Sequence, residues 1–147
     1  MKPLLELVGE HAIPYLRTFP SVKVWLPNCA SAAEADAAAG IFRAAGLLPR
    51  TMIYATSTSD VVLSQLRRSA FDHLTFATHN LATDASFNEF QLIACLNRIT
   101  LSQRALGLLN QSLCRFGLLA ISVGEHELSI AGAHYVPFAP DILKKIT

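Results

Sequence analysis

The sequence predicts an α/β fold, with a mostly parallel sheet and helices on both faces. Short apolar segments of strand length recur along the chain, and patterns typical of helices separate them. The chain has 147 residues and contains no internal repeat, low-complexity tract or linker. We therefore expect residues 1–147 to form a single domain.

The first elements follow from local patterns. Pro3 suits the first turn of a helix, and apolar residues follow it at helical spacing. Pro14 is expected to end or restart that helix. Residues 22–26 alternate as a strand does, and an alanine-rich helix from about residue 31 to 45 follows, closed by Gly46.

The same alternation continues along the chain. Further strands are expected at residues 52–55, 74–77, 92–95, 118–122 and 133–138. Further helices are expected at residues 60–68 and 101–115. Ligands of parallel sheets bind beyond the carboxyl ends of the strands. Those ends are expected at residues 27–29, 56–58, 79–81 and 96–98.

The composition argues against a nucleic-acid partner and favours a protein partner. With 12 Lys+Arg and 11 Asp+Glu, the chain has no basic field for nucleic acid. Hydrophobic residues make up 52% and charged residues 16%, a small polar share for the surface of a domain of this size. We therefore expect some apolar surface to be buried against a protein partner, most simply a second copy in a homo-oligomer such as a dimer.

The three cysteines, Cys29, Cys95 and Cys114, have no metal-like spacing and indicate reduced thiols in a cytoplasmic protein. The amino-terminal segment is too polar for a signal-peptide core, and no apolar run is long enough to span a bilayer. The sequence thus predicts a cytoplasmic protein that binds no metal, membrane or nucleic acid.

Segments at the expected strand ends carry a resemblance to a known family. They are PYLRTFPSVKVW, NCASAAEA, IYATS, FATHNLATDASFNEFQLIACLN and LGLLNQSLCRFGLLAIS. In this order, over residues 16–124, they resemble the catalytic domain of CheR-type chemotaxis receptor methyltransferases, and residues 76–95 match most specifically. The resemblance implies a Rossmann-like, S-adenosylmethionine-dependent methyltransferase fold. The family methylates glutamate side chains of chemotaxis receptors.

The chain departs from this family where the cofactor should bind. Asn28 and Ala32 stand where the cofactor turn of the family has glycines, which let the backbone turn tightly. Of the paired acids in that turn, only Glu34 is present. Ser57 replaces the aspartate that the family uses on the ribose hydroxyls, and Leu96 replaces an arginine.

Asn80, Leu81 and Asn97 match positions that the family uses for cofactor contacts. By resemblance, the residual cofactor site consists of Glu34, Ser57, Asn80, Leu81 and Asn97. The resemblance also implies two missing pieces. These are the N-terminal helical domain and the β-subdomain insert, which would fall between Arg68 and Phe71.

Each residual residue also has a structural interpretation. Ser31 and Glu34 form a capping-box pattern, which we favour over a cofactor role for Glu34. Ser57 precedes a helix, so a capping role is favoured there as well. Asparagines at strand ends often close turns, so both interpretations stay open for Asn80 and Asn97.

Other reactive side chains receive structural interpretations. His79 follows a strand but has no partner in the sequence that would make it a base. Cys29 is interpreted as a buried or inert thiol, although a helix start can lower a thiol pKa. Asp36 and Asp84 are interpreted as solvent or turn carboxylates, and no catalytic residue is assigned.

We therefore expect a degenerate, truncated CheR-like domain that binds S-adenosylmethionine weakly or not at all. Its function would be protein association in a chemotaxis-like signalling system. One alternative is an active protein-glutamate methyltransferase with an altered site that a partner chain completes. Another retains the pocket for a different small ligand without chemistry.

Overall fold

The computed structural model describes residues 3–27, 29–57, 59–66, 74–78, 89–96, 103–121 and 135–146. The helical segments are α1 (Leu4–Leu7), a π-helical turn (Val8–Ala12), α2 (Ile13–Leu16), α3 (Ala32–Ala44), a 3₁₀ turn (Leu48–Arg50), α4 (Asp60–Leu66) and α5 (Gln103–Ser112). The strands are β1 (Val22–Leu26), β2 (Thr51–Ser57), β3 (Leu74–Thr78), β4 (Phe90–Cys95), β5 (Leu113–Ile121), β6 (Tyr135–Ala139) and β7 (Ile142–Lys145). All the expected strands are present.

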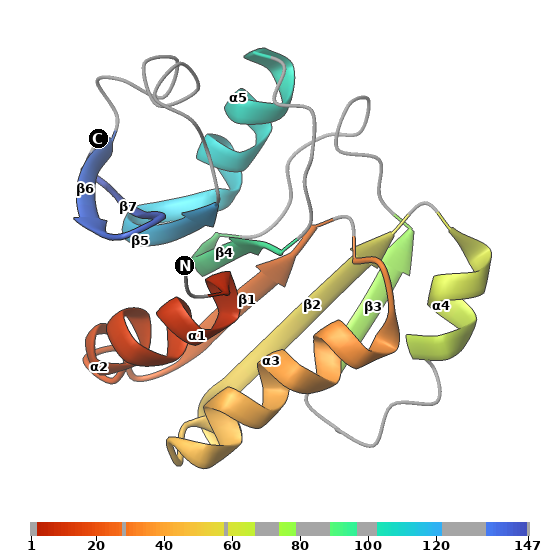
Figure 1. Cartoon of the computed structure of the whole chain (residues 1–147). Helices are drawn as coiled ribbons and strands as arrows, with labels where there is room; N and C mark the ends of the chain where they lie inside the picture. The colour runs from red at the N-terminus through yellow and green to blue at the C-terminus, as the bar shows by residue number, and fades with distance from the viewer. Residues whose placement is uncertain are drawn as a thin grey trace.

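The strands form one seven-stranded sheet in the order β3-β2-β1-β4-β5-β7-β6 (Figure 1). Strands β1 to β5 pair in parallel. Strand β7 pairs antiparallel with both β5 and β6, so it alone runs against the others. The mostly parallel α/β sheet expected from the sequence is confirmed.

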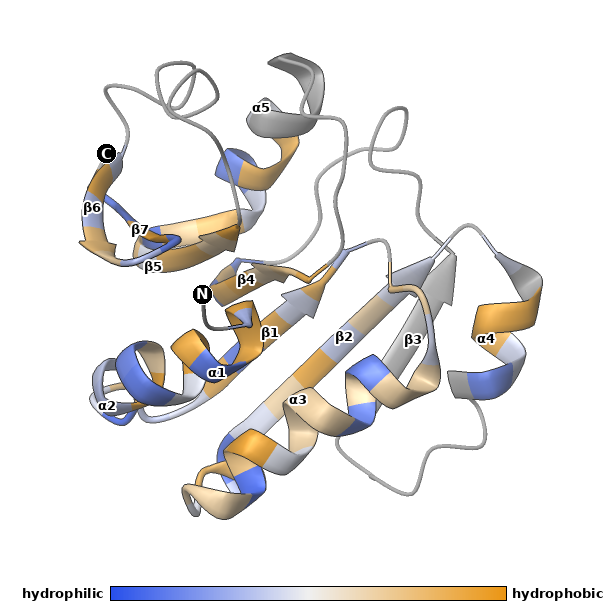
Figure 2. Cartoon of the chain, in the orientation of Figure 1, coloured by the Kyte–Doolittle hydropathy of each residue, from blue (hydrophilic) through white to orange (hydrophobic). Residues whose placement is uncertain are grey.

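Helices cover both faces of the sheet, as expected. On one face, apolar side chains of α1, α2, α3 and α4 pack against alternate strand residues such as Val24 and Ile53. On the other face, Leu108 and Leu109 of α5 pack against the intervening residues, including Trp25. Successive strand side chains point to opposite faces, which explains this division. Figure 2 shows hydrophobic colour along β1, β4 and β5 and on parts of α1, α4 and α5.

The first helical run contains an adjustment next to Pro14. Proline lacks an N–H and its ring crowds the preceding turn of a helix. Here the backbone widens into the π-helical turn Val8–Ala12 directly before α2, in which Pro14 is the second residue. The helix therefore restarts at the proline, which is one of the two expected outcomes.

Helix α3 ends as the sequence predicts. Gly46 has φ of +76°, a left-handed conformation that glycine adopts without strain. The amide of Leu47 donates to the Phe42 carbonyl at 2.9 Å, and the amide of Gly46 donates to the Arg43 carbonyl at 3.0 Å. These are the two hydrogen bonds of a Schellman cap.

In the carboxyl-terminal half one expectation was wrong and one strand was not expected. The helix expected over residues 101–115 ends at Ser112, and β5 begins at Leu113 rather than at residue 118. Strand β7, Ile142–Lys145, was not expected, since Lys144 and Lys145 look like ordinary surface residues. In both places strand pairing overrides the local pattern.

Within the residue ranges that the structure describes, no helix is both long and apolar enough to cross a membrane.

Candidate functional site

The candidate site lies where β1, β2, β3 and β4 end, because the carboxyl ends of parallel strands meet at one edge of a sheet. The structure places two of the residual cofactor residues, Glu34 and Ser57, at this edge. Asn80, Leu81 and Asn97 lie outside the described residues, as do Asn28 and His79. Their expected roles stay predictions.

The turn between β1 and α3 is held to the end of β2. The amide of Cys29 donates to the Thr56 carbonyl at 2.8 Å. On the adjoining sheet face, the indole N–H of Trp25 donates to the Thr56 hydroxyl at 2.9 Å. Thr56 thereby links the ends of β1 and β2 through both its backbone and its side chain.

The expected capping box is half present. Ser31 occupies the N-cap position of α3, but its hydroxyl makes no capping hydrogen bond, so that part of the expectation was wrong. The Glu34 carboxylate does bind a free amide at the helix start, that of Ala30, at 3.1 Å. Glu34 thus has a structural role at the turn where its cofactor role was also considered.

The thiol of Cys29 is buried and inert, as interpreted from the sequence. Burial raises the Cys29 pKa from its ordinary value of 9.0 to about 11. The thiol donates a hydrogen bond to the Ser31 carbonyl, with an Sγ–O distance of 3.1 Å, which also favours the protonated form. A thiol with such a pKa is protonated near neutral pH, so it is neither a nucleophile nor a base there.

Ser57 ends β2 with only 5% of its surface exposed. Its hydroxyl accepts a hydrogen bond from the Ser59 amide at 3.0 Å, which closes the turn before α4. The helix itself is capped by Ser59, whose hydroxyl accepts from the Val62 amide at 3.4 Å. The capping role expected for Ser57 therefore belongs to Ser59.

An aromatic cluster on the sheet face that α5 covers was not expected from the sequence. Trp25 and Phe90 stack with ring centroids 5.6 Å apart, and Tyr54 meets Phe90 edge-on at 5.4 Å. These residues come from three neighbouring strands. The signal that could have found them is the alternation of side chains on paired strands, once the strand order is known.

In this part of the edge, the described residues do not fit the cofactor implied by the resemblance. Position 57 carries a neutral hydroxyl already engaged with a backbone amide, rather than a carboxylate. Position 32 carries the Cβ of an alanine at the first turn of α3, rather than a glycine. Among the described residues, no group of His, Cys, Asp or Glu is arranged to hold a metal ion.

Comparisons with known proteins agree with the fold. No protein-family model matches the chain. A Pseudomonas putida protein named "Putative methyltransferase Cher3" is 32% identical to it over 162 aligned residues, covering 80% of this chain and 59% of that protein. The chain thus spans about three fifths of the length of this curated relative.

Two solved structures resemble the chain over most of its length. A TehB-like methyltransferase from Corynebacterium glutamicum, dependent on S-adenosylmethionine, has a TM-score of 0.63 at 15% identity, covering 93% of this chain and 85% of that one. The N-methyltransferase NodS from Bradyrhizobium japonicum, solved with S-adenosylhomocysteine, has a TM-score of 0.62 at 12% identity, covering 98% and 88%. The chain therefore has the Rossmann-like fold of S-adenosylmethionine-dependent methyltransferases.

Proposed function

We propose that this chain is a CheR-like methyltransferase-fold domain that has lost efficient binding of S-adenosylmethionine and methyl transfer, and that it acts by protein association. The observation that carries the proposal is the state of Ser57. Its hydroxyl is buried and engaged with the Ser59 amide at the position where the CheR family has a ribose-binding aspartate.

The loss of affinity follows from the hydrogen bonds that are absent. A hydrogen bond to a charged group contributes about 1.5–3 kcal/mol, and about 1.4 kcal/mol corresponds to a factor of ten in affinity. Losing the carboxylate at position 57 thus weakens cofactor binding by roughly one to two decades. The extra Cβ of Ala32 and the substitution at Asn28 add to this, so a loss of about 10³-fold is expected.

The loss of catalysis that we propose is a matter of positioning. Methyl transfer depends on holding an acceptor carboxylate in line with the methyl group, and such positioning supplies most of the rate. Two thiols are described at this edge, Cys29 and, at the end of β4, Cys95. Burial raises their pKa values to about 11 and about 12, so both are protonated near neutral pH and offer no substitute chemistry.

The association role is supported by composition and by the resemblance. Charged residues make up 16% and hydrophobic residues 52% of the chain, which favours a partner-covered surface. The partner is a protein, and a second copy of the chain is the simplest case. The resemblance to CheR-type enzymes favours a chemotaxis-like signalling system in the cytoplasm, where the free thiols found here are stable.

A second candidate is an active methyltransferase of altered site. It is favoured by the similarity to Cher3 and by the structural neighbour NodS, which binds S-adenosylhomocysteine. In this case Asn80, Glu34 and Ser57 would hold the cofactor and a partner chain would complete the site.

A transfer assay and light scattering test the two candidates together. The protein is incubated with tritium-labelled S-adenosylmethionine and a cell lysate rich in chemotaxis receptors. The proposal expects no label above that of a heat-inactivated sample, whereas labelled glutamates would establish the enzyme. Light scattering then measures the mass of the purified protein with and without that lysate fraction. We expect an assembly larger than one chain, and a strict monomer under both conditions would contradict the association role.

A further inference from the structure

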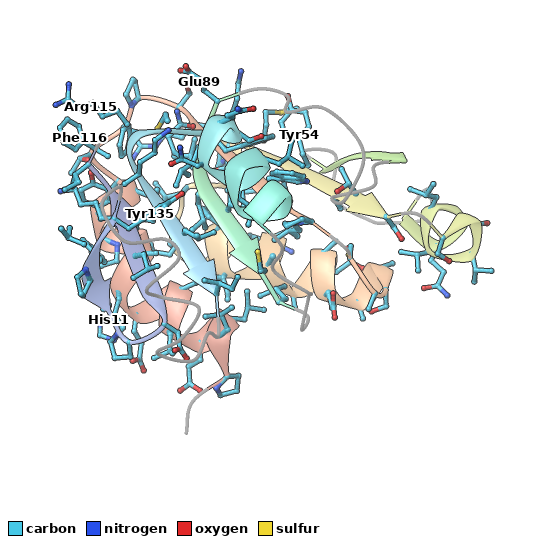
Figure 3. The ribbon with its side chains drawn as sticks, turned by 90° about the horizontal axis from the view of Figure 1, so that it is seen from above. His11, Tyr54, Glu89, Arg115, Phe116 and Tyr135 are labelled. Atoms are coloured by element: carbon cyan, nitrogen blue, oxygen red, sulfur yellow. The ribbon has the colours of Figure 1, made fainter. Side chains whose placement is uncertain are left out.

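Strand β5 contains a bulge that places an aromatic side chain on the surface. Phe90 and Leu92 of β4 pair with Leu113 and Leu118 of β5, so two steps along one strand face five along the other. Such bulges redirect side chains. Here the redirected side chain is Phe116, which is 44% exposed (Figure 3).

Phe116 is held in a strained backbone conformation. Its φ is +68°, a region in which side chains other than glycine and asparagine are disfavoured and a bulky one is rare. The hydroxyl of Tyr15 donates to the Phe116 carbonyl at 2.8 Å and holds the bulge against α2. Strain of this kind around an exposed side chain is typical of functional positions.

Two cations surround this ring. The guanidinium carbon of Arg115 lies 4.9 Å from the Phe116 ring centroid. The ammonium nitrogen of Lys144 lies 5.6 Å from the same centroid and 5.0 Å from that of Tyr15. Among the residues that the structure describes, no carboxylate forms an ion pair with Arg115 or Lys144. Tyr15, Arg115, Phe116 and Lys144 are called the bulge surface below.

The bulge surface is separate from the candidate cofactor site. Leu113 and Phe90 pair at the amino ends of their parallel strands, whereas Ser57 lies at the carboxyl end of β2. The bulge surface therefore lies at the opposite edge of the sheet. Its use does not depend on cofactor binding.

We propose that the bulge surface docks an acidic segment of a protein partner, with Phe116 as the apolar anchor and Arg115 and Lys144 binding its carboxylates. Aromatic residues and arginine are enriched at the energetic centres of interfaces. Two cations that form no ion pair with a carboxylate of the described residues favour a negatively charged occupant. This proposal deepens the association role and rests on it.

The test measures binding of a fluorescein-labelled nonapeptide of glutamates with one central tryptophan, by fluorescence anisotropy at about 50 mM salt. Its comparison peptide carries glutamines in place of the glutamates. We expect the glutamate peptide to bind at least roughly tenfold tighter, and this difference to shrink at about 300 mM salt, where charges are screened. Equal binding of the two peptides would overturn the proposal.

Variants locate the binding on the bulge surface. Arg115→Glu is expected to weaken binding roughly tenfold or more, whereas Arg43→Glu, an equal change in charge on the exposed side of α3, leaves it nearly unchanged. Equal weakening by both would contradict a local site. Phe116→Gly is expected to weaken binding and raise Tm, because it relieves the strained φ; this variant stays informative if Arg115→Glu fails to fold.

The outcomes separate this proposal from the association role itself. If Arg115→Glu leaves peptide binding intact, the bulge surface is ruled out as the binding site, while the association role still stands. A wild-type dimer that Arg115→Glu dissociates in sedimentation would mean that a second copy, rather than an acidic segment, occupies the surface. Binding of S-adenosylmethionine is measured in a separate experiment, which tests the proposed loss of cofactor binding and does not depend on the bulge surface.

Discussion

The side chain of Ser57 lies at the end of β2 with its hydroxyl engaged by the Ser59 amide. A carboxylate at this position would have two acceptor oxygens, one for the turn and one for a ligand. The neutral Ser57 hydroxyl, already bonded in the turn, offers a ligand a weaker hydrogen bond than a carboxylate would. Under the proposed function, Ser57 keeps the turn and lacks the charge that would bind a ribose.

Placing the CheR-type residues at positions 28, 32 and 57 tests whether these positions weaken cofactor binding. The combined variant Asn28→Gly, Ala32→Gly and Ser57→Asp is expected to bind S-adenosylhomocysteine at least roughly tenfold tighter than the wild type, because it regains a charge-assisted hydrogen bond. Calorimetry on the folded variant measures this. Ser57→Ala is the control and is expected to gain nothing. No gain in the combined variant would place the cause of weak binding elsewhere.

Two glycines differ in the space available for the methyl group of an alanine. A Cβ at Gly117 would lie 2.7 Å from a Leu113 methyl and 3.0 Å from the Cys114 carbonyl oxygen. Gly117→Ala is expected to lower the free energy of unfolding by about 1–3 kcal/mol, as overpacking does. Gly40 in α3 has nothing within 4 Å, so Gly40→Ala is expected to raise it by about 0.5–1 kcal/mol. Urea denaturation measures the free energy of unfolding of both variants. Changes of the same sign in the two variants would contradict the close packing around Gly117.

At this scale the sequence predicts residue types better than partners. The S-x-x-E pattern of residues 31–34 correctly places the Glu34 carboxylate at the start of α3. It does not show that Ser31 leaves the cap unmade, because that depends on the turn geometry set by Cys29 and Thr56. Serines at 57 and 59 are both plausible caps in sequence, and only the backbone decides for Ser59.

At the scale of elements, buried strands are predictable and sheet margins are not. The apolar runs of β1 and β4 are covered on both faces, so composition alone reveals them. The sequence of α5 and the start of β5 keeps a helical spacing of leucines through Leu113, so the boundary between them is hidden. Strand β7 ends in two lysines, which its partly exposed end tolerates. An apolar pattern therefore does not reveal it as a strand.

Lys145 links two of these elements. Its ammonium donates to the carbonyls of Asn110 and Leu113, at 2.6 and 2.7 Å, where α5 gives way to β5. Carbonyls at a helix end favour such a cation. Lys145→Met is expected to lower the free energy of unfolding by about 1–3 kcal/mol.

Lys144→Met is the matched control, because the Lys144 ammonium lies over the Tyr15 and Phe116 rings, a contact that contributes about 0.5–1 kcal/mol. Chemical denaturation of the two variants compares them directly. Equal losses would mean that the Lys145 hydrogen bonds add nothing to stability.

At the scale of the whole molecule, the two cores on either side of the sheet hold protonated thiols. Burial raises the pKa of Cys29 to about 11 and that of Cys95 to about 12, from an ordinary value of 9.0. The unfolded chain loses these protons at lower pH than the folded one. Their contribution to stability is therefore complete below about pH 9 and is lost as pH rises toward 11 to 12.

Denaturation at a series of pH values measures this effect. We expect the free energy of unfolding to fall between pH 9 and about 11, and to fall less steeply in Cys95→Ala. Comparing the two proteins at each pH removes the contributions of other groups that titrate in this range. Parallel curves would show that the Cys95 thiol ionises alike in both states.

The chain has the methyltransferase fold, and we propose that the edge of its sheet no longer binds the cofactor efficiently. Calorimetric titration of the folded wild-type protein with S-adenosylmethionine and S-adenosylhomocysteine measures this binding. We expect no binding heat up to about millimolar ligand. Dissociation constants in the micromolar range would contradict it, because Asn28, Ala32 and Ser57 would then be compatible with a working cofactor site.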